Sequence, residues 1–138
     1  MGDAGLILLD TQAVVWLDSA DARLGPATRE LLDRALSDGE LALSAVSFCE
    51  VAWLARAGRL ALPTSVVGWR NSLLSAGLGE VPLDGEIAIA AALLPEFHKD
   101  LADRLIVATA LVEGARLVTS DSRILAWPGT LDRADARR

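Results

Sequence analysis

Residues 101–121 read LADRLIVATALVEGARLVTSD, and they give the clearest indication of the fold class. Apolar residues lie nearly all round Leu101–Glu113, which predicts a helix at the centre of the fold. Gly114 ends this helix, as glycine commonly does. Arg116–Thr119 follow as a predicted strand, and Asp121 comes just after it.

The same alternation of helices and short strands extends over the rest of the chain. The other predicted strands are Leu6–Leu9, Leu41–Leu43 and Val81–Leu83. The other predicted helices are Thr11–Ser19, Pro26–Asp38, Val46–Ala57, Thr64–Ala76 and Gly85–Leu94, with a brief helix after Asp121. This pattern predicts an α/β fold in which helices cover both faces of a short, mostly parallel sheet.

Length and composition fit one globular domain over residues 1–138. Apolar residues make up 52 % of the chain, enough for a substantial core. The longest apolar runs, Ile87–Leu94 and Leu105–Val112, are too short to span a membrane, and no basic segment precedes the N-terminal apolar run as in a signal peptide. The tail from about residue 128 is polar and is expected to be partly irregular. A single cysteine excludes an internal disulfide and fits a cytoplasmic protein.

The charge balance is acidic, with a formal net charge of −6 at pH 7. Such a balance argues against a broad basic surface for non-specific binding of nucleic acids. It does not exclude RNA, because cations bound by acidic side chains would remove most of this charge. The basic residues are 12 Arg and one Lys, and arginine is suited to bidentate contacts with phosphate.

Four acidic residues are candidates for a functional site: Asp10, Glu50, Asp103 and Asp121. Asp10 and Asp121 follow predicted strands, and functional residues gather beyond the carboxyl ends of the strands in α/β sheets. Each acid also has an ordinary structural interpretation. Asp10 and Asp121 can cap the helices that follow them. Glu50 stands three residues after Ser47, as in a capping box, and Asp103 lies in the first turn of its helix, where negative charge is favoured.

The capping interpretation is least satisfactory for Glu50 and Asp103. Four apolar residues share the predicted helix face of Glu50, which is therefore expected to point inward: Val46, Trp53, Leu54 and Ala57. Asp103 lies on a helix that is apolar nearly all round, and its neighbour Arg104 faces elsewhere. An inward carboxylate is costly unless it is paired or binds a metal. Because no basic residues stand at matching positions, a divalent cation is the better explanation, and carboxylate oxygens suit Mg²⁺ or Mn²⁺.

Three segments, in this order, resemble the PIN-domain ribonucleases of the VapC type, the toxins of bacterial toxin–antitoxin pairs. They are LILLDTQAVVWL (6–17), LALSAVSFCEVAWLARAGRLALP (41–63) and HKDLADRLIVATALVEGARLVTSD (98–121), which together span most of the chain. Two features depart from the family's pattern. Leu101 stands where members often have proline, and WPGTLDRADARR (127–138) replaces the usual final apolar strand, so the sequence leaves a C-terminal strand open.

The resemblance implies a PIN-like three-layer α/β fold with Asp10, Glu50, Asp103 and Asp121 as its acidic quartet. The resemblance also implies that Thr119 is a polar residue that lies near these acids and assists them. The implied activity is that of an endoribonuclease dependent on Mg²⁺ or Mn²⁺, acting on structured RNA such as tRNA, and the implied partners are a second copy of the chain and a cognate antitoxin. Arg104 is a further candidate for a contact with substrate or antitoxin, its other interpretation being structural.

Phosphodiester hydrolysis needs a water made nucleophilic near neutral pH and neutralisation of the charge that develops on the phosphate. One metal ion, or two about 4 Å apart, can supply both. In this hypothesis Asp10 and Asp103 are the principal ligands. Glu50 completes the ligand set or orients the attacking water, and Asp121 binds a second ion or holds ligand waters.

A Cys–His nucleophilic dyad is a weaker alternative. Cys49 and His98 are the only residues of their types, but Cys49 lacks a nucleophile turn and is expected to be a small core residue. His98 is expected to lie in a loop beside the site.

Two other classes of α/β protein, and a PIN domain without catalytic activity, are also less well supported. A phosphatase of the haloacid-dehalogenase type would need an acid where Gln12 stands, and a receiver domain would need a late catalytic lysine, whereas the only lysine is Lys99. The remaining alternative is a PIN domain kept only for protein binding. The presence of all four acids argues against it.

Overall fold

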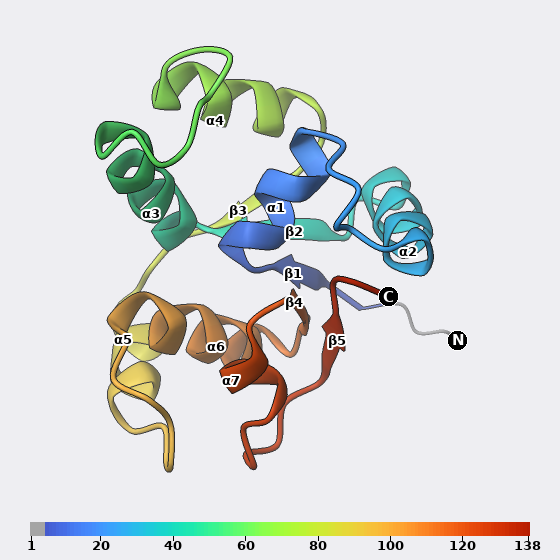
Figure 1. Ribbon diagram of the computed structural model, residues 1–138. Coiled ribbons are helices and arrows are strands. Elements are labelled where there is room, and N and C mark those ends of the chain that lie inside the picture. The colour runs from blue at the N-terminus through green and yellow to red at the C-terminus, as the bar shows by residue number, and fades with distance from the viewer. Residues whose placement is uncertain (1–4) are drawn as a thin grey trace.

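A computed structural model describes residues 5–138, which form one sheet with helices on both sides (Figure 1). The strands lie in the order β3-β2-β1-β4-β5, and every neighbouring pair is parallel. The strands are β1 (Ile7–Leu9), β2 (Leu41–Ser44), β3 (Gly79–Val81), β4 (Arg116–Thr119) and β5 (Arg133–Asp135). The helices are α1 (Thr11–Asp18), α2 (Pro26–Ser37), α3 (Ala45–Arg56), α4 (Val66–Ser75), α5 (Gly85–Ala92), α6 (Leu101–Glu113) and α7 (Ser122–Leu125).

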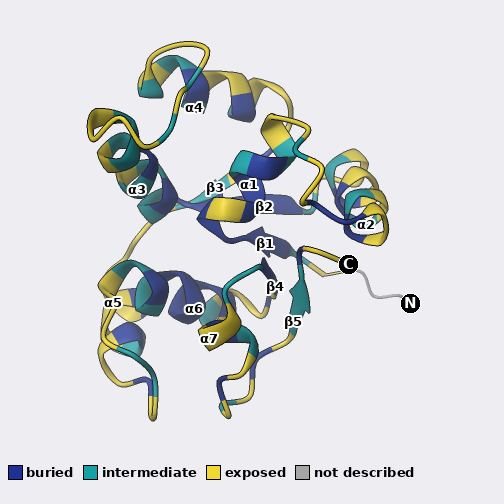
Figure 2. Cartoon of the chain, viewed as in Figure 1, coloured by how far each residue is buried: buried dark blue, intermediate teal, exposed yellow. Residues whose placement is uncertain are grey.

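Alternation along the strands divides the core into two layers. Ile7 and Leu9 pack in the cluster that includes residues of α1, α2, α3 and α4, whereas Leu8 packs with α6 and α7. Helix α5 lies outside α6, which it contacts through Ile87 and Ala91. Figure 2 shows β1, β2 and β4 buried between these layers. The predicted α/β fold, with three layers and a parallel sheet, is therefore confirmed.

The sequence left open whether the tail from about residue 128 contains a strand, and Arg133–Asp135 do form one. These residues form β5, which pairs with β4 in the register Leu117↔Arg133 and Thr119↔Asp135. An edge strand needs main-chain hydrogen bonds on one side only, and its side chains can reach water, so a polar sequence is compatible with the position. The end of the chain is also anchored, because the amide of Gly25 donates to the carbonyl of Ala136 at 2.9 Å.

Gly25 is required by this anchoring. A Cβ atom added there would lie 2.1 Å from the carbonyl oxygen of Arg138, far inside van der Waals contact. The amide of Thr28, in the first turn of α2, donates to that same carbonyl at 2.9 Å. The last residues therefore satisfy donors at the start of α2, which would otherwise lack partners.

Helix α3 buries a different face from the one that the apolar pattern predicts. Its buried residues are Ser47 and Val51, whereas the side chain of Trp53 is 66 % exposed. Cys49 is also exposed, so its assignment to the core is wrong. None of the helices within residues 5–138 is both long enough and apolar enough to cross a membrane.

Candidate active site

The parallel pairing of β1 and β4 brings Asp10 and Thr119 together at the carboxyl edge of the sheet. Thr119 ends β4 and is fully buried, and its hydroxyl donates to Asp10 Oδ2 at 2.6 Å. The amide of Asp121 donates back to Thr119 Oγ1 at 3.0 Å. Thr119 therefore links the two strand-end acids and fixes the rotamer of Asp10.

Asp10 is a buried carboxylate whose hydrogen bonds come from neutral donors. Only 6 % of the residue is exposed, and its Oδ1 accepts from the amide of Thr11 at 2.8 Å, as the N-cap of α1. Within residues 5–138 it forms no ion pair with a basic side chain. Burial raises the pKa of Asp10 to about 6, with repulsion from Asp103 and Asp121 in the same direction and the hydrogen bonds from Thr119 and Thr11 opposing it.

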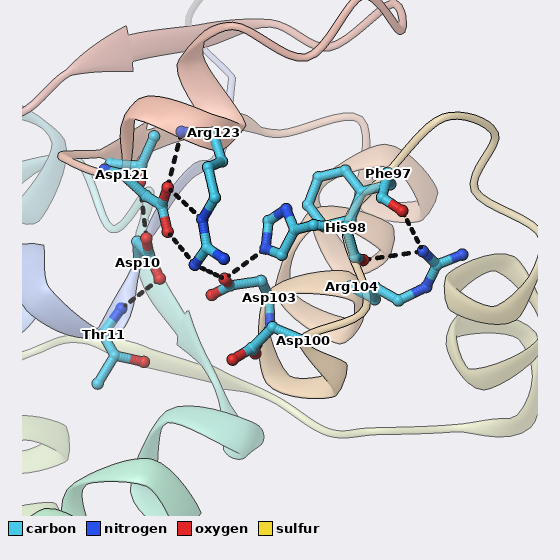
Figure 3. Close-up of polar contacts among 10 residues, drawn as sticks. Asp10, Thr11, Phe97, His98, Asp100, Asp103, Arg104, Asp121 and Arg123 are labelled. Atoms are coloured by element: carbon cyan, nitrogen blue, oxygen red, sulfur yellow. Dashed lines mark hydrogen bonds and ion pairs between the residues drawn. The ribbon is translucent and has the colours of Figure 1, made fainter.

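Asp103 approaches the same edge from the first turn of α6. Its amide donates to the N-cap Asp100 at 3.0 Å, and the residue is only 8 % exposed. Asp103 Oδ2 lies 2.8 Å from His98 Nε2 and 3.3 Å from Arg123 Nη2 (Figure 3). Burial raises the pKa of Asp103, although the hydrogen bond with His98 lowers it in part.

Glu50 lies on α3 and is linked to the site by a hydrogen bond with Thr11, the first residue of α1. Its Oε1 accepts a hydrogen bond from the hydroxyl of Thr11, which also lies 2.9 Å from Ser47 Oγ. Partial burial raises the pKa of Glu50, and repulsion from Asp10 and Asp103 adds to the effect. Glu50 therefore lies near the other acids, in agreement with the inward direction predicted for it. The apolar helix face assigned to it, however, is not the face that α3 buries.

Asp121 differs from these three acids because its contacts with Arg123 lower its pKa overall, whereas the pKa values of the other three are raised. It caps α7 through the amide of Arg123 at 2.8 Å, and the Arg123 guanidinium contacts both of its carboxylate oxygens, at 3.4 and 3.3 Å. Burial alone would raise the pKa of Asp121, but hydrogen bonds and attraction from Arg123 outweigh burial and lower it.

Arg104 does not join the acids. Its guanidinium donates to main-chain carbonyls at the end of α5 and in the loop before α6: those of Ala91, Ala92, Leu94, Phe97 and His98. These bonds occupy the guanidinium nitrogens and hold the loop that carries His98 (Figure 3). The contacts favour the structural interpretation of Arg104 over a contact with substrate.

Two residues of the cluster, His98 and Arg123, were not among the predicted site residues. His98 lies in the loop as expected, but its ring bonds to Asp103 instead of standing beside the site, and it stacks on Phe97 with ring centroids 4.3 Å apart. No contact supports a dyad with Cys49, which is exposed on α3. A sequence signal for Arg123 did exist, since Asp-x-Arg occurs three times in the chain.

The donor set fits a divalent cation. His98, Asp103 and Asp121 each offer one ligand atom, and these atoms lie within 4.8 Å of one another. Asp10 and Glu50 stand next to this triplet without belonging to it in the part of the chain that the structure describes. Asp10 and Glu50 have raised pKa values and form no ion pair among residues 5–138, and the pKa of Asp103 is raised although His98 and Arg123 contact it. An added positive charge would stabilise all three carboxylates. Hard oxygen donors with one imidazole suit Mg²⁺ or Mn²⁺.

Comparison with known proteins agrees with the fold. The family model described as PIN domain matches residues 7–128. Ribonuclease VapC22 of Mycobacterium tuberculosis (strain ATCC 25618 / H37Rv) is 38 % identical over 119 residues, which are 86 % of this chain and 88 % of that protein.

Two solved structures resemble the fold at low sequence identity. VapBC2 from Rickettsia felis, bound to a DNA fragment from its promoter, is 16 % identical with a TM-score of 0.67, over 94 % of this chain and 99 % of that one. DNA-bound VapBC from Salmonella typhimurium is 16 % identical with a TM-score of 0.66, over 96 % and 98 %. The family model and the 38 % identical relative, each covering most of the sequence, show that this chain belongs to the PIN domain family.

Proposed function

We propose that this chain is an endoribonuclease dependent on Mg²⁺ or Mn²⁺, and that it acts as the toxin of a toxin–antitoxin pair. The observation that carries the proposal is the meeting of Asp10, Glu50, Asp103 and Asp121 at one edge of the sheet, three of them with raised pKa values. Membership of the PIN family and 38 % identity to a protein named Ribonuclease VapC22 support it.

Each residue of the site has a separate proposed role in phosphodiester hydrolysis. A divalent cation bound here would lower the pKa of a water molecule and offset the charge that develops on the phosphate. Asp10 and Asp103 are the proposed principal ligands, and Thr119 holds Asp10 in the orientation that presents its carboxylate to the site. Glu50 orients the attacking water, which its raised pKa also equips it to deprotonate. Asp121 completes the set of oxygen ligands.

The proposed partners are a cognate antitoxin, a second copy of the chain and, in the cytoplasm, structured RNA such as tRNA. An apolar hollow of about 330 Å³ supports a protein partner. Helices α3 and α6 contribute Trp53 and Leu101 to it, whose exposed fractions are 66 % and 68 %. Glu50 also lines this hollow, so a protein bound there would lie next to the acids.

The direct test is cleavage of RNA by the purified protein. Cleavage should require Mg²⁺ or Mn²⁺, stop with EDTA, and fall by about a hundredfold or more in Asp10→Asn. Glu80→Gln is the matched control. Glu80 lies on the edge strand β3, away from the site, and is paired with Arg70 of α4. Sequencing of RNA ends after brief expression in cells would identify the targets. Cleavage that persists in EDTA, or at the parent rate in Asp10→Asn, contradicts the proposal.

A further inference from the structure

Arg123 is the basic residue that bridges two acids of the site. Its Nη2 lies 3.3 Å from Asp103 Oδ2 and 3.3 Å from Asp121 Oδ2 (Figure 3). Its side chain is 57 % exposed, whereas that of Asp103 is 11 % exposed. The guanidinium therefore reaches from the solvent side onto carboxylate oxygens at the mouth of the site.

The two other Asp-x-Arg turns of the chain show what is particular to Arg123. In all three turns the aspartate accepts from the arginine amide, at 2.9 Å for Arg23, 2.8 Å for Arg123 and 3.0 Å for Arg137. The Arg23 and Arg137 side chains each pair with the aspartate of their own turn. Arg123 pairs in addition with Asp103, 20 residues away and on another helix. The local turn explains its contact with Asp121 and does not explain the bridge.

The bridge engages two of the carboxylates that a cation would need. Asp103 and Asp121 belong to the triplet of residues whose ligand atoms lie within 4.8 Å of one another. A guanidinium and a divalent cation both stabilise this pair of carboxylates, and like charges repel, so both cannot hold the pair at full strength. The long contacts and the exposure of Arg123 make its ion pairs weak ones that a divalent cation can displace.

We propose that Arg123 is an exchangeable counter-ion: it holds Asp103 and Asp121 in the metal-free protein, gives way to the divalent cation, and then binds a phosphate of the RNA backbone. The proposal rests on the proposed function and extends it with a substrate-binding residue. Anchoring by the Asp121 turn keeps the released guanidinium beside the site, and arginine is suited to bidentate contacts with phosphate oxygens.

Calorimetric titration of the metal-free protein with MnCl₂ tests the exchange without any need for catalysis. Arg123→Gln should bind Mn²⁺ about two- to tenfold more tightly than the parent, because the cation no longer competes with the ion pairs of Arg123, whose side chain is largely exposed. Arg123→Lys should fall between them. Arg23→Gln, which changes the same turn outside the site, should bind as the parent does.

Steady-state kinetics at saturating Mn²⁺ test the phosphate contact. Arg123→Gln should raise KM for RNA several-fold and change kcat less, while Arg23→Gln changes neither. An arginine that only supports the fold would instead weaken Mn²⁺ binding when removed, so the sign of the change decides. Equal or weaker Mn²⁺ binding by Arg123→Gln, or an unchanged KM, overturns the proposed role of Arg123. Neither result contradicts the proposed ribonuclease function. A parent protein that binds no Mn²⁺ contradicts the proposed function itself.

Discussion

Glu80 and Asp10 are two carboxylates of the same sheet with opposite surroundings. Glu80, on edge strand β3, receives two hydrogen bonds from the Arg70 guanidinium, at 2.7 and 3.0 Å, and this contact lowers its pKa. Asp10, at the end of the central strand β1, accepts side-chain hydrogen bonds from the Thr119 hydroxyl and the Thr11 amide and, among residues 5–138, from no basic group. Burial raises its pKa to about 6.

The chain contains 12 arginines, so the different surroundings of Glu80 and Asp10 follow from where the arginines lie and not from a shortage of them. Exposed arginines pair with acids at the surface elsewhere, as Arg23 does with the partly exposed Asp21 and Arg116 with the exposed Asp132. The most buried acid of the site has no such partner within residues 5–138, and its neighbours Glu50 and Asp103 also have raised pKa values. The metal-free site is therefore unfavourable for folding near neutral pH, and a bound cation would relieve this.

The largest expected effect is on the pH dependence of stability in EDTA. Asp10 has a pKa of about 6 in the folded protein against an ordinary value of 3.8, so its stabilising contribution is full below pH 3.8 and is lost as the pH rises to 6. The loss from Asp10 alone is about 3 kcal/mol, and Glu50 and Asp103 add to it in the same direction. Urea unfolding between pH 4 and pH 7 should show this decline, and saturating Mg²⁺ should reduce it. A stability that rises over this range would contradict the assignment.

Asp10→Asn should stabilise the metal-free protein at pH 7. The neutral amide removes the charge penalty. Part of the gain is offset because the amide has a single acceptor oxygen and cannot accept from both the Thr119 hydroxyl and the Thr11 amide, as the carboxylate does. A net gain of about 1–2 kcal/mol is expected in EDTA. Chemical denaturation of parent and variant measures it. A destabilised variant would mean that Asp10 serves the fold as an N-cap before anything else.

Asp103→Asn should separate a cation ligand from a helix-end charge. At a Mg²⁺ concentration about ten times the dissociation constant, the parent should gain about 1.4 kcal/mol by mass action. The gain should shrink or vanish in Asp103→Asn, which lacks one proposed ligand. Paired melting curves with and without the ion provide the measurement. An equal response to Mg²⁺ in both proteins would remove Asp103 from the ligand set.

Glu80→Gln should have the smallest effect, and of opposite sign to Asp10→Asn. Removal of the charge breaks a partly exposed ion pair with Arg70, so the variant should be slightly less stable at pH 7. Its response to Mg²⁺ should match that of the parent. Thermal melting beside Asp10→Asn provides the comparison, and a stabilised Glu80→Gln would show that the two carboxylates do not differ as described.

The strand-end acids could be predicted from the sequence because their positions follow from local patterns. Asp10 and Asp121 come directly after short apolar runs, and parallel strands bring such positions to one edge. The strand β5 could not be found in this way, since Arg133–Asp135 is polar and is held by its pairing with β4 and by contacts with the start of α2.

Helix α3 shows where periodicity misleads. Trp53 and Val46 share the face of Glu50, but that face borders the exposed apolar hollow, and the helix packs inward through Ser47 and Val51. Ser47 is a poor core residue by type, and it is buried because its hydroxyl meets that of Thr11. The position of His98 depends on the path of a loop whose carbonyls accept hydrogen bonds from Arg104, and no periodic pattern in the sequence reveals such contacts.

The bond between Thr119 and Asp10 joins residues 109 positions apart, and this sets a time at which the site can form. At roughly 5–20 residues per second, ribosomes need about 5–20 s to extend the chain from one residue to the other. Until then Asp10 belongs to a strand without its β4 neighbour, and β4 in turn gains its outer neighbour only after residues 133–135 have emerged. The acidic cluster therefore cannot assemble on the nascent chain before β4 has been synthesised, even though Asp10 leaves the ribosome long before.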